Sequence, residues 1–211
     1  MGCLKSIIKK IIFFALLFAF FFFGGCDFVV TKYNEFTCPP REELLEQSKD
    51  FGNFAAVSSD YRLTRSLNIF GYRKFNSQYM PTGQKITIID LNKKEVITPE
   101  DFKTGVINTK IKDTLNLLKD SLITLENLEI TGRGTVSANG RLIPYVNFKA
   151  DVKNVPFKSV EGTMGAYRSA NISQKKKNKE AQQTTKVILS MRDCKKYNQQ
   201  VTLDFIKAMK P

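Results

Sequence analysis

The sequence predicts an α+β fold in which a mostly antiparallel sheet packs against a long central helix and a C-terminal helix. Three patterns in the 211 residues support this prediction. Apolar residues alternate on both sides of Asn139-Gly140, recur every three or four positions between Pro99 and Leu122, and recur every four positions between Lys195 and Lys210. The first pattern indicates paired strands, and the other two indicate helices with one apolar face each.

Residues 1–25 form a segment unlike the rest of the chain. Three lysines and no acid precede Ile11–Phe23, a run of thirteen apolar residues. A basic start followed by a short apolar run is typical of a signal peptide. At about 1.5 Å per residue the run reaches roughly 20 Å, less than the roughly 30 Å hydrocarbon core of a bilayer. We therefore predict a signal peptide at 1–25.

The residues after the apolar run carry the most specific motif in the chain. Phe23-Gly24-Gly25-Cys26 resembles the lipobox of bacterial lipoprotein precursors, with Phe23 where that family usually has Leu, Val or Ile. The resemblance implies that the Cys26 thiol receives a diacylglycerol and that the chain is cut just before it. Each buried CH₂ of an acyl chain contributes about 0.8 kcal/mol, so two or three chains would hold the protein at a membrane. The implied partner is membrane lipid, bound through acylated Cys26.

Two other interpretations of the N-terminus remain open. An uncleaved signal anchor from Ile7 to Gly25 would leave the following domain on the same side of the membrane. Met1-Gly2-Cys3 with Ser6 also resembles a eukaryotic myristoylation and palmitoylation signal. A soluble acylated protein does not need thirteen apolar residues directly after its acylation site, which favours the bacterial interpretation.

The four cysteines leave one possible disulfide. Cys3 leaves with the signal peptide and Cys26 is expected to be acylated, so Cys38 and Cys194 remain. Because domain termini often lie close together, we name Cys38 and Cys194 as a candidate disulfide, with two unpaired thiols as the alternative. Neither belongs to a CxxC pair, so no metal site is predicted.

We expect 26–40 to be a tether and 41–211 to be a single α+β domain. The tether ends at Pro39-Pro40, and helix formers with two early acids follow, which predicts a short helix over Arg41–Lys49. Residues 51–75 show no clear periodicity.

Two predictions concern the chain between residues 85 and 122. Lys85–Leu91 alternates and predicts a strand, which we expect to form a hairpin with Glu95–Ile97. Thr98-Pro99 followed by two acids marks the start of the central helix, which is expected to run with some interruption to Leu122.

The clearest local signal is a long hairpin over Leu125–Val152. Asn139-Gly140 supplies the two positive-φ positions of a type I′ turn. Gly132-Arg133-Gly134 within the hairpin predicts a bulge or bend, because it lacks the lysine-serine ending of a phosphate loop and no helix follows it.

The last 52 residues predict a second strand pair and a helix. Val160–Ala170 and Thr185–Met191 are expected to be strands, separated by a solvated loop that holds Lys175–Lys179. Apolar spacing over Lys195–Lys210 predicts a closing helix, with a last strand at Val201–Ile206 as the alternative.

The order of elements in the second half resembles the PsbP-like lipoprotein domains. It consists of a long helix, an extended hairpin, strands near Val160-Glu161-Gly162 and Val187–Met191, and a terminal helix ending at Pro211. The likeness covers about 110 residues and is one of element order only. It implies a small envelope domain without catalytic machinery, and no functional residue is carried over.

Composition excludes several functional classes. The chain contains no histidine, which removes Ser-His-Asp and Cys-His catalysis, HExxH zinc sites and imidazole pH switches.

The mature chain is expected to be basic. Removing the three lysines of the signal leaves 30 basic against 20 acidic residues, a balance that favours an anionic leaflet nearby. The candidate anion-binding patch consists of Arg62, Arg65, Arg73 and Lys74, interleaved with aromatic residues. Nucleic acid is not expected as a partner, because the domain is exported.

The sequence therefore predicts a membrane-anchored bacterial lipoprotein on the extracytoplasmic side of the cell membrane, with the leaflet left open. Its domain is expected to be a non-catalytic binding or structural module, without cofactor or metal, whose partner is an envelope protein or anionic lipid. One alternative is an envelope carrier of a small apolar or anionic ligand. A second is an uncleaved signal-anchor protein.

Overall fold

The computed structural model describes residues 39–64, 67–69, 72–91, 96–118, 124–153, 158–170 and 183–211. Within this part of the chain, Arg41–Pro211 forms one compact unit. The predicted signal peptide, the lipobox and all of the tether except Pro39-Pro40 lie outside the described residues. None of the described helices has the length and apolar character needed to cross a membrane.

One antiparallel sheet of eight strands dominates the fold. Its strands follow the order β1-β3-β4-β8-β7-β6-β5, and β2 also pairs with β3. The strands are β1 (Tyr61–Leu63), β2 (Leu67–Ile69), β3 (Tyr72–Tyr79), β4 (Gln84–Asp90), β5 (Thr124–Ala138), β6 (Arg141–Lys153), β7 (Ser159–Ala170) and β8 (Gln183–Asp193). The predicted mostly antiparallel sheet is confirmed.

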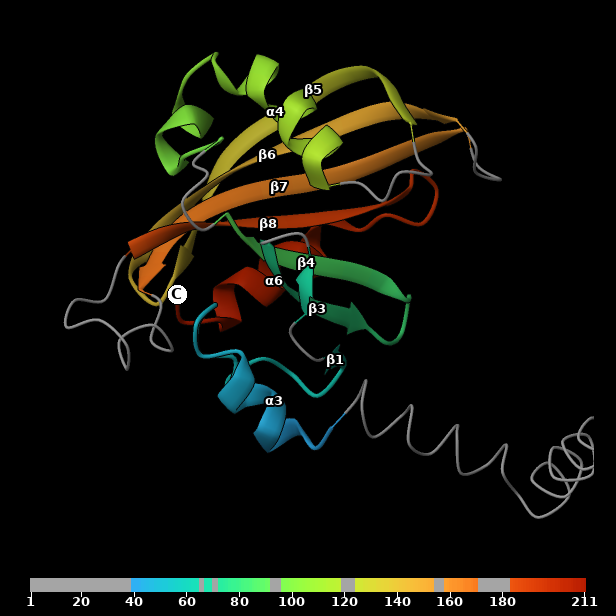
Figure 1. Ribbon diagram of the computed structural model, residues 1–211. Helices are drawn as coiled ribbons and strands as arrows, with labels where there is room; N and C mark the ends of the chain where they lie inside the picture. Colours follow the sequence, from blue (N-terminus) through green and yellow to red (C-terminus); the bar gives the residue numbers. More distant parts are fainter. Residues whose placement is uncertain are drawn as a thin grey trace, which may run out of the picture. The chain divides into compact units, whose positions relative to one another are not determined.

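Short helices cover both faces of the sheet. They are α3 (Arg41–Gln47), the 3₁₀ helix η1 (Pro99–Lys103), α4 (Ile107–Leu118) and α6 (Gln199–Ala208). In Figure 1, α4 and α6 lie on opposite sides of the long strands. Neighbouring residues of a strand point to opposite faces, so each helix meets its own set of sheet residues.

The sheet separates two hydrophobic clusters. Ile188 of β8 packs in the cluster beneath α6, whereas its neighbours Val187 and Leu189 pack in the cluster beneath α4. β8 is therefore buried on both faces, which explains why its central residues do not alternate between apolar and polar.

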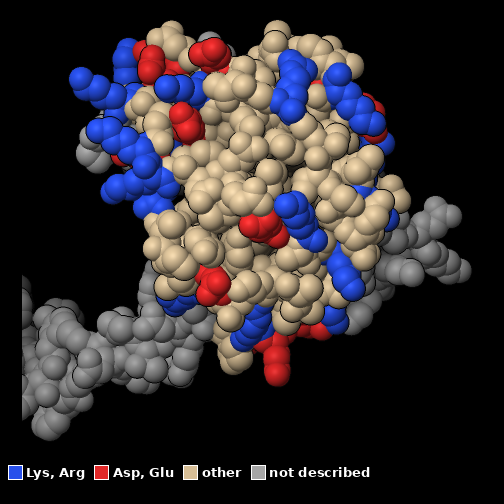
Figure 2. All heavy atoms as spheres, turned by 180° about the vertical axis from the view of Figure 1, so that it is seen from behind, with Lys and Arg blue, Asp and Glu red and all other residues tan. Residues whose placement is uncertain are grey.

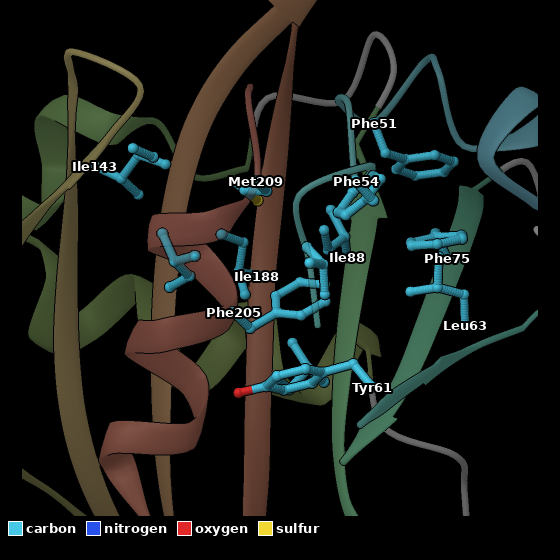
Figure 3. Packing of buried hydrophobic residues seen from close by; sticks show 14 of the residues in the cluster. Phe51, Phe54, Tyr61, Leu63, Phe75, Ile88, Ile143, Ile188, Phe205 and Met209 are labelled. Carbon is cyan, nitrogen blue, oxygen red and sulfur yellow. The ribbon is translucent and has the colours of Figure 1, made fainter. Parts of the chain in front are cut away.

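Aromatic side chains fill the cluster on the α6 side. Figure 3 shows Phe54 between the rings of Phe75 and Phe205, with centroid distances of 4.8 and 5.7 Å. Tyr61 points its hydroxyl toward α6 and donates to the Val201 carbonyl at 2.7 Å. These contacts fix α6 against Tyr61 of β1 and, through Phe54, against Phe75 of β3.

Several local predictions are confirmed. The long hairpin turns at Asn139 (φ 49°) and Gly140 (φ 80°), the positive-φ pair that a type I′ turn requires. β7 and β8 form the predicted antiparallel pair. The first and last helices occur as α3 and α6, and the alternative strand at Val201–Ile206 is not seen.

Two predictions are wrong. In place of one long central helix, η1 and the twelve-residue α4 are separated by Thr104, which has extended backbone (φ −116°, ψ 167°), and by Gly105, a poor helix former. β4 forms its hairpin with β3 through a turn at Met80–Gly83, and pairs with β8 on its other side. Val96 and Ile97 form a bend rather than the expected partner strand.

Candidate binding site

A polar pocket of about 460 Å³ lies between the sheet and the start of α6. Three adjacent strands, β5, β6 and β7, supply one wall, and the residues around the first turn of α6 supply the other. The lining residues are Thr131, Asn147, Phe148, Glu161, Gly162, Tyr197, Asn198 and Gln199. Its volume falls within the roughly 300–1,000 Å³ typical of small-molecule sites.

A β-bulge shapes the β5 side of the pocket. The strand register shifts between Ile130 and Gly132, so Thr131 has no paired residue on β6. A Cβ atom at Gly132 would lie 3.3 Å from the Asn147 Nδ2, so the missing side chain lets the amide lie across β5. The predicted bulge is confirmed, and its position places Asn147 and Thr131 at the pocket.

Gly134, two residues after Gly132 on β5, leaves room for the side chain of Tyr145. A Cβ atom at Gly134 would lie 2.6 Å from the Tyr145 hydroxyl, closer than any real contact. Tyr145 therefore extends over β5, where its hydroxyl accepts a hydrogen bond from Gln199 Nε2 at 3.5 Å. This contact helps to position one lining residue of α6.

A directed chain of hydrogen bonds orients Asn147. Thr163 Oγ1 donates to Asn147 Oδ1 at 2.7 Å, which uses the only proton of the threonine hydroxyl. The Tyr197 hydroxyl, 2.5 Å from Thr163 Oγ1, must then donate to it. Thr202 also hydrogen-bonds Tyr197, and Gln84 Nε2 donates to Thr202 at 3.0 Å.

This chain leaves the Asn147 Nδ2 group as its open end. Gln84, Thr163 and Thr202 are fully buried, so the hydrogen bonds behind the pocket are shielded from water. Burial raises the pKa of Tyr197, although hydrogen bonds with Thr163 and Thr202 oppose the shift. The phenol therefore keeps its proton and acts as a donor.

Gln84 also joins β4 to the beginning of α6. Its Nε2 lies 2.9 Å from the Asn198 carbonyl oxygen, and its Oε1 accepts from the Asn198 backbone N–H at 2.9 Å. Asn198 in turn caps α6, because its side-chain oxygen accepts from the Gln200 backbone N–H at 2.9 Å. The α6 wall of the pocket is therefore held rigidly over the sheet.

Of the described residues that line the pocket, Glu161 alone carries a charged side chain. Among the residues that the structure describes, its half-buried carboxylate makes no hydrogen bond or ion pair. Lys149 and Arg192 lie opposite Glu161 on the neighbouring strands, but neither lines the pocket. The Arg192 guanidinium donates instead to the Thr82 carbonyl.

A second polar group, the buried ion cluster, consists of Asp50, Arg73, Asp90 and Lys186. Arg73 binds the carboxylates of Asp50 and Asp90, and Lys186 binds Asp90. Burial would lower the pKa of Arg73, but hydrogen bonds to the two carboxylates outweigh it and raise the pKa. Burial lowers the pKa of Lys186, opposed by Asp90. Because Asp90 and Lys186 are fully buried, this cluster is structural and not a binding site.

The candidate anion-binding residues do not form one patch. Arg73 is three-quarters buried against its carboxylates, and its neighbour Lys74 points to the opposite face of β3. Arg62 is exposed on β1 and pairs in register with Gln78, whereas Arg65 lies outside the described residues. On the face shown in Figure 2, Lys and Arg gather toward the rim with Asp and Glu among them, and uncharged residues cover most of the middle.

The cysteine predictions remain untested. Cys26 and Cys38 lie outside the described residues, and so does the lysine-rich segment 175–179. Cys194 is half-buried, and its thiol lies 3.2 Å from Ser159 Oγ. Within the described residues, no cluster of three or more His, Cys, Asp or Glu side chains is arranged to hold a metal ion.

No pocket residue belongs to the sites that the sequence predicts. Asn147 and Glu161 lie in ordinary strand patterns, and Tyr197 appears only as an apolar position of the last helix. The one sequence feature that could have indicated the pocket is the pair Gly132 and Gly134. Glycines within a strand predict a bulge, and bulges often lie beside functional sites.

Comparison with known proteins gives no family assignment. No family model matches the chain, and no curated protein matches it.

Proposed function

We propose that the protein is a bacterial lipoprotein, anchored to the cell membrane through Cys26, whose domain binds a ligand or a partner in the envelope. The observation that carries the anchor is the sequence Phe23-Gly24-Gly25-Cys26 directly after thirteen apolar residues. The thiol of the last residue is the nucleophile that such lipidation requires.

The pocket beneath α6 supports a binding function for the domain. Its walls carry amide, hydroxyl and carboxylate groups, and the hydrogen bonds behind them are buried and fixed. Fixed polar groups that converge on a concave site are typical of ligand binding. This lining favours neither an apolar nor an anionic ligand, because polar groups would lose hydrogen bonds to the first and Glu161 would repel the second.

Metabolic labelling tests the anchor. Cells that express the full chain are grown with an alkyne analogue of palmitate, and label is measured on wild type, Cys26→Ala and Cys3→Ala. We expect Cys26→Ala to lose the label and Cys3→Ala to keep it. Cys3→Ala is a matched control, since it removes a thiol from the same N-terminal region.

Two other labelling results would overturn the lipid anchor at Cys26, and each would support a different alternative. Loss of label in Cys3→Ala alone would support the myristoylation and palmitoylation signal. An unlabelled chain that stays in the membrane fraction with residues 1–25 attached would support the uncleaved signal anchor.

A further inference from the structure

We propose that the pocket beneath α6 binds a neutral polyhydroxylated ligand, such as a mono- or disaccharide. The inference rests on the proposed binding function of the domain, and it does not depend on the lipid anchor.

The lining offers donors and acceptors together. Asn147 presents its Nδ2 donors, because its Oδ1 is occupied by Thr163. Glu161 presents only acceptors, and the Thr131 hydroxyl both donates and accepts. Sugar hydroxyls also donate and accept at once, so adjacent hydroxyls on a ring match such a mixed set.

The charge of the lining argues against an anionic ligand. Among the described residues that line the pocket, Glu161 is the one ionisable group besides the neutral phenol of Tyr197, and none is a Lys or Arg. A phosphate or carboxylate would meet a fixed negative charge with no cation in direct contact. Apart from Phe148 and Gly162, the remaining lining residues carry neutral hydrogen-bonding side chains, which favours an uncharged polar ligand over a highly charged one.

The Asn147 side chain is held in place before a ligand binds, which favours the binding of sugar hydroxyls, each of which contributes little affinity. Its orientation is set by the buried chain through Thr163, Tyr197, Thr202 and Gln84. A side chain that is already fixed loses little rotamer freedom on binding, so more of the hydrogen-bond energy appears as affinity. The bulged Thr131 lies in the wall opposite α6.

Ligand-observed saturation-transfer NMR tests this inference on the full-length protein. The protein is solubilised in a detergent without a sugar headgroup, because alkyl glycosides would compete for the site. The probes are three neutral disaccharides (cellobiose, maltose and chitobiose), glucose 6-phosphate as an anion and spermidine as a cation. We expect transfer to at least one neutral disaccharide and none to glucose 6-phosphate.

Variants of the protein test whether the saturation transfer arises from ligand bound in the pocket. Asn147→Leu should raise the dissociation constant of the bound disaccharide about tenfold, as expected for the loss of one hydrogen-bond donor to the ligand. Thr163→Val removes the hydroxyl that orients Asn147 without entering the lining, so a several-fold loss is expected. The control is Gln200→Leu, which removes an exposed amide from the same end of α6.

The outcomes separate this inference from the function on which it rests. Asn147-dependent binding of only glucose 6-phosphate or only spermidine would overturn the neutral saccharide as the ligand and leave ligand binding intact. Absence of transfer from every probe, or equal binding by Asn147→Leu and wild type, would overturn the saccharide site. If Asn147→Leu does not fold, as judged by its thermal unfolding, Thr163→Val decides the question. The anchor is judged separately by labelling at Cys26.

Discussion

Asp90 and Lys186 lie opposite each other on β4 and β8, with their charged groups 2.8 Å apart and both side chains fully buried. The row continues in register, because Arg73 faces Asp90 from β3 and Tyr167 faces Lys186 from β7. Tyr167 donates its hydroxyl to the Phe51 carbonyl, which closes the row against the chain after α3. One polar row therefore crosses four strands inside the α6 side of the core.

Breaking this row should destabilise the domain strongly. In Asp90→Asn the carboxylate shared by Arg73 and Lys186 becomes a neutral amide, which leaves the two cations with only the Asp50 carboxylate among the four cluster residues and so with excess buried positive charge. We expect the free energy of unfolding to fall by about 3–5 kcal/mol, measured by urea denaturation followed by circular dichroism.

The matched control is Asp204→Asn. Asp204 pairs with Lys207 at 3.4 Å on the surface of α6, and both side chains are half exposed. Such a pair contributes less than about 1 kcal/mol. Equal losses in the two variants would show that the buried ion cluster has no special role in stability.

Gly162 on β7 should not tolerate a side chain. A Cβ atom there would lie 2.5 Å from Cζ of the Phe148 ring and 2.6 Å from the Ser190 carbonyl oxygen. The backbone oxygen cannot move aside, so Gly162→Ala should cost about 1–3 kcal/mol in the same urea experiment. Gly105→Ala is the control, since nothing lies within 4 Å of its Cβ position. An unchanged midpoint for Gly162→Ala would refute the close packing of β6, β7 and β8.

The parts of the fold that the sequence predicted are those with local causes. Asn139-Gly140 dictates its own turn, and the Asn198 cap and apolar spacing of α6 lie within a few residues of each other. The β3–β4 hairpin was missed because β3 carries Arg73, Lys74 and other polar residues, so its sequence lacks the apolar alternation that marks β4 as a strand. Arg73 resembles a surface cation until Asp50 and Asp90 are placed beside it.

The pocket could not be predicted for the same reason. Thr131, Asn147, Glu161 and Tyr197 approach one another only after β5 to β7 pair and α6 packs across them. Thr163 looks like any strand threonine in the sequence, yet its one proton decides which way the Asn147 amide points.

The candidate disulfide gives a redox prediction. If Cys38 and Cys194 pair, the bond closes a loop of more than 150 residues, and the chain-entropy model assigns it about 5 kcal/mol. Reductant should then lower the free energy of unfolding and slow migration in a denaturing gel, and Cys194→Ala should show neither change. Identical mobility with and without reductant, together with alkylation of both thiols, would instead establish two free cysteines.

Tyr61 should make the domain lose stability in alkaline solution. Burial, with smaller contributions from Asp204, Tyr79 and Asp60, raises the pKa of its phenol from 10.0 to about 12. Between these values the unfolded chain releases the proton while the folded chain keeps it. The stability linked to this group is therefore fully present below pH 10 and is lost as pH rises toward 12, in total roughly 2–3 kcal/mol.

Comparison of wild type with Tyr61→Phe isolates this effect, because other tyrosines, including Tyr167, titrate in both proteins. At pH 8 the variant should be about 1 kcal/mol less stable, since it lacks the hydrogen bond to the Val201 carbonyl. As the pH is raised from 10 to 11, only wild type loses the Tyr61 contribution, so the difference in unfolding free energy should shrink and then reverse. A difference that stays constant from pH 8 to pH 11 would mean that the Tyr61 hydroxyl ionises equally easily in the folded and unfolded chains.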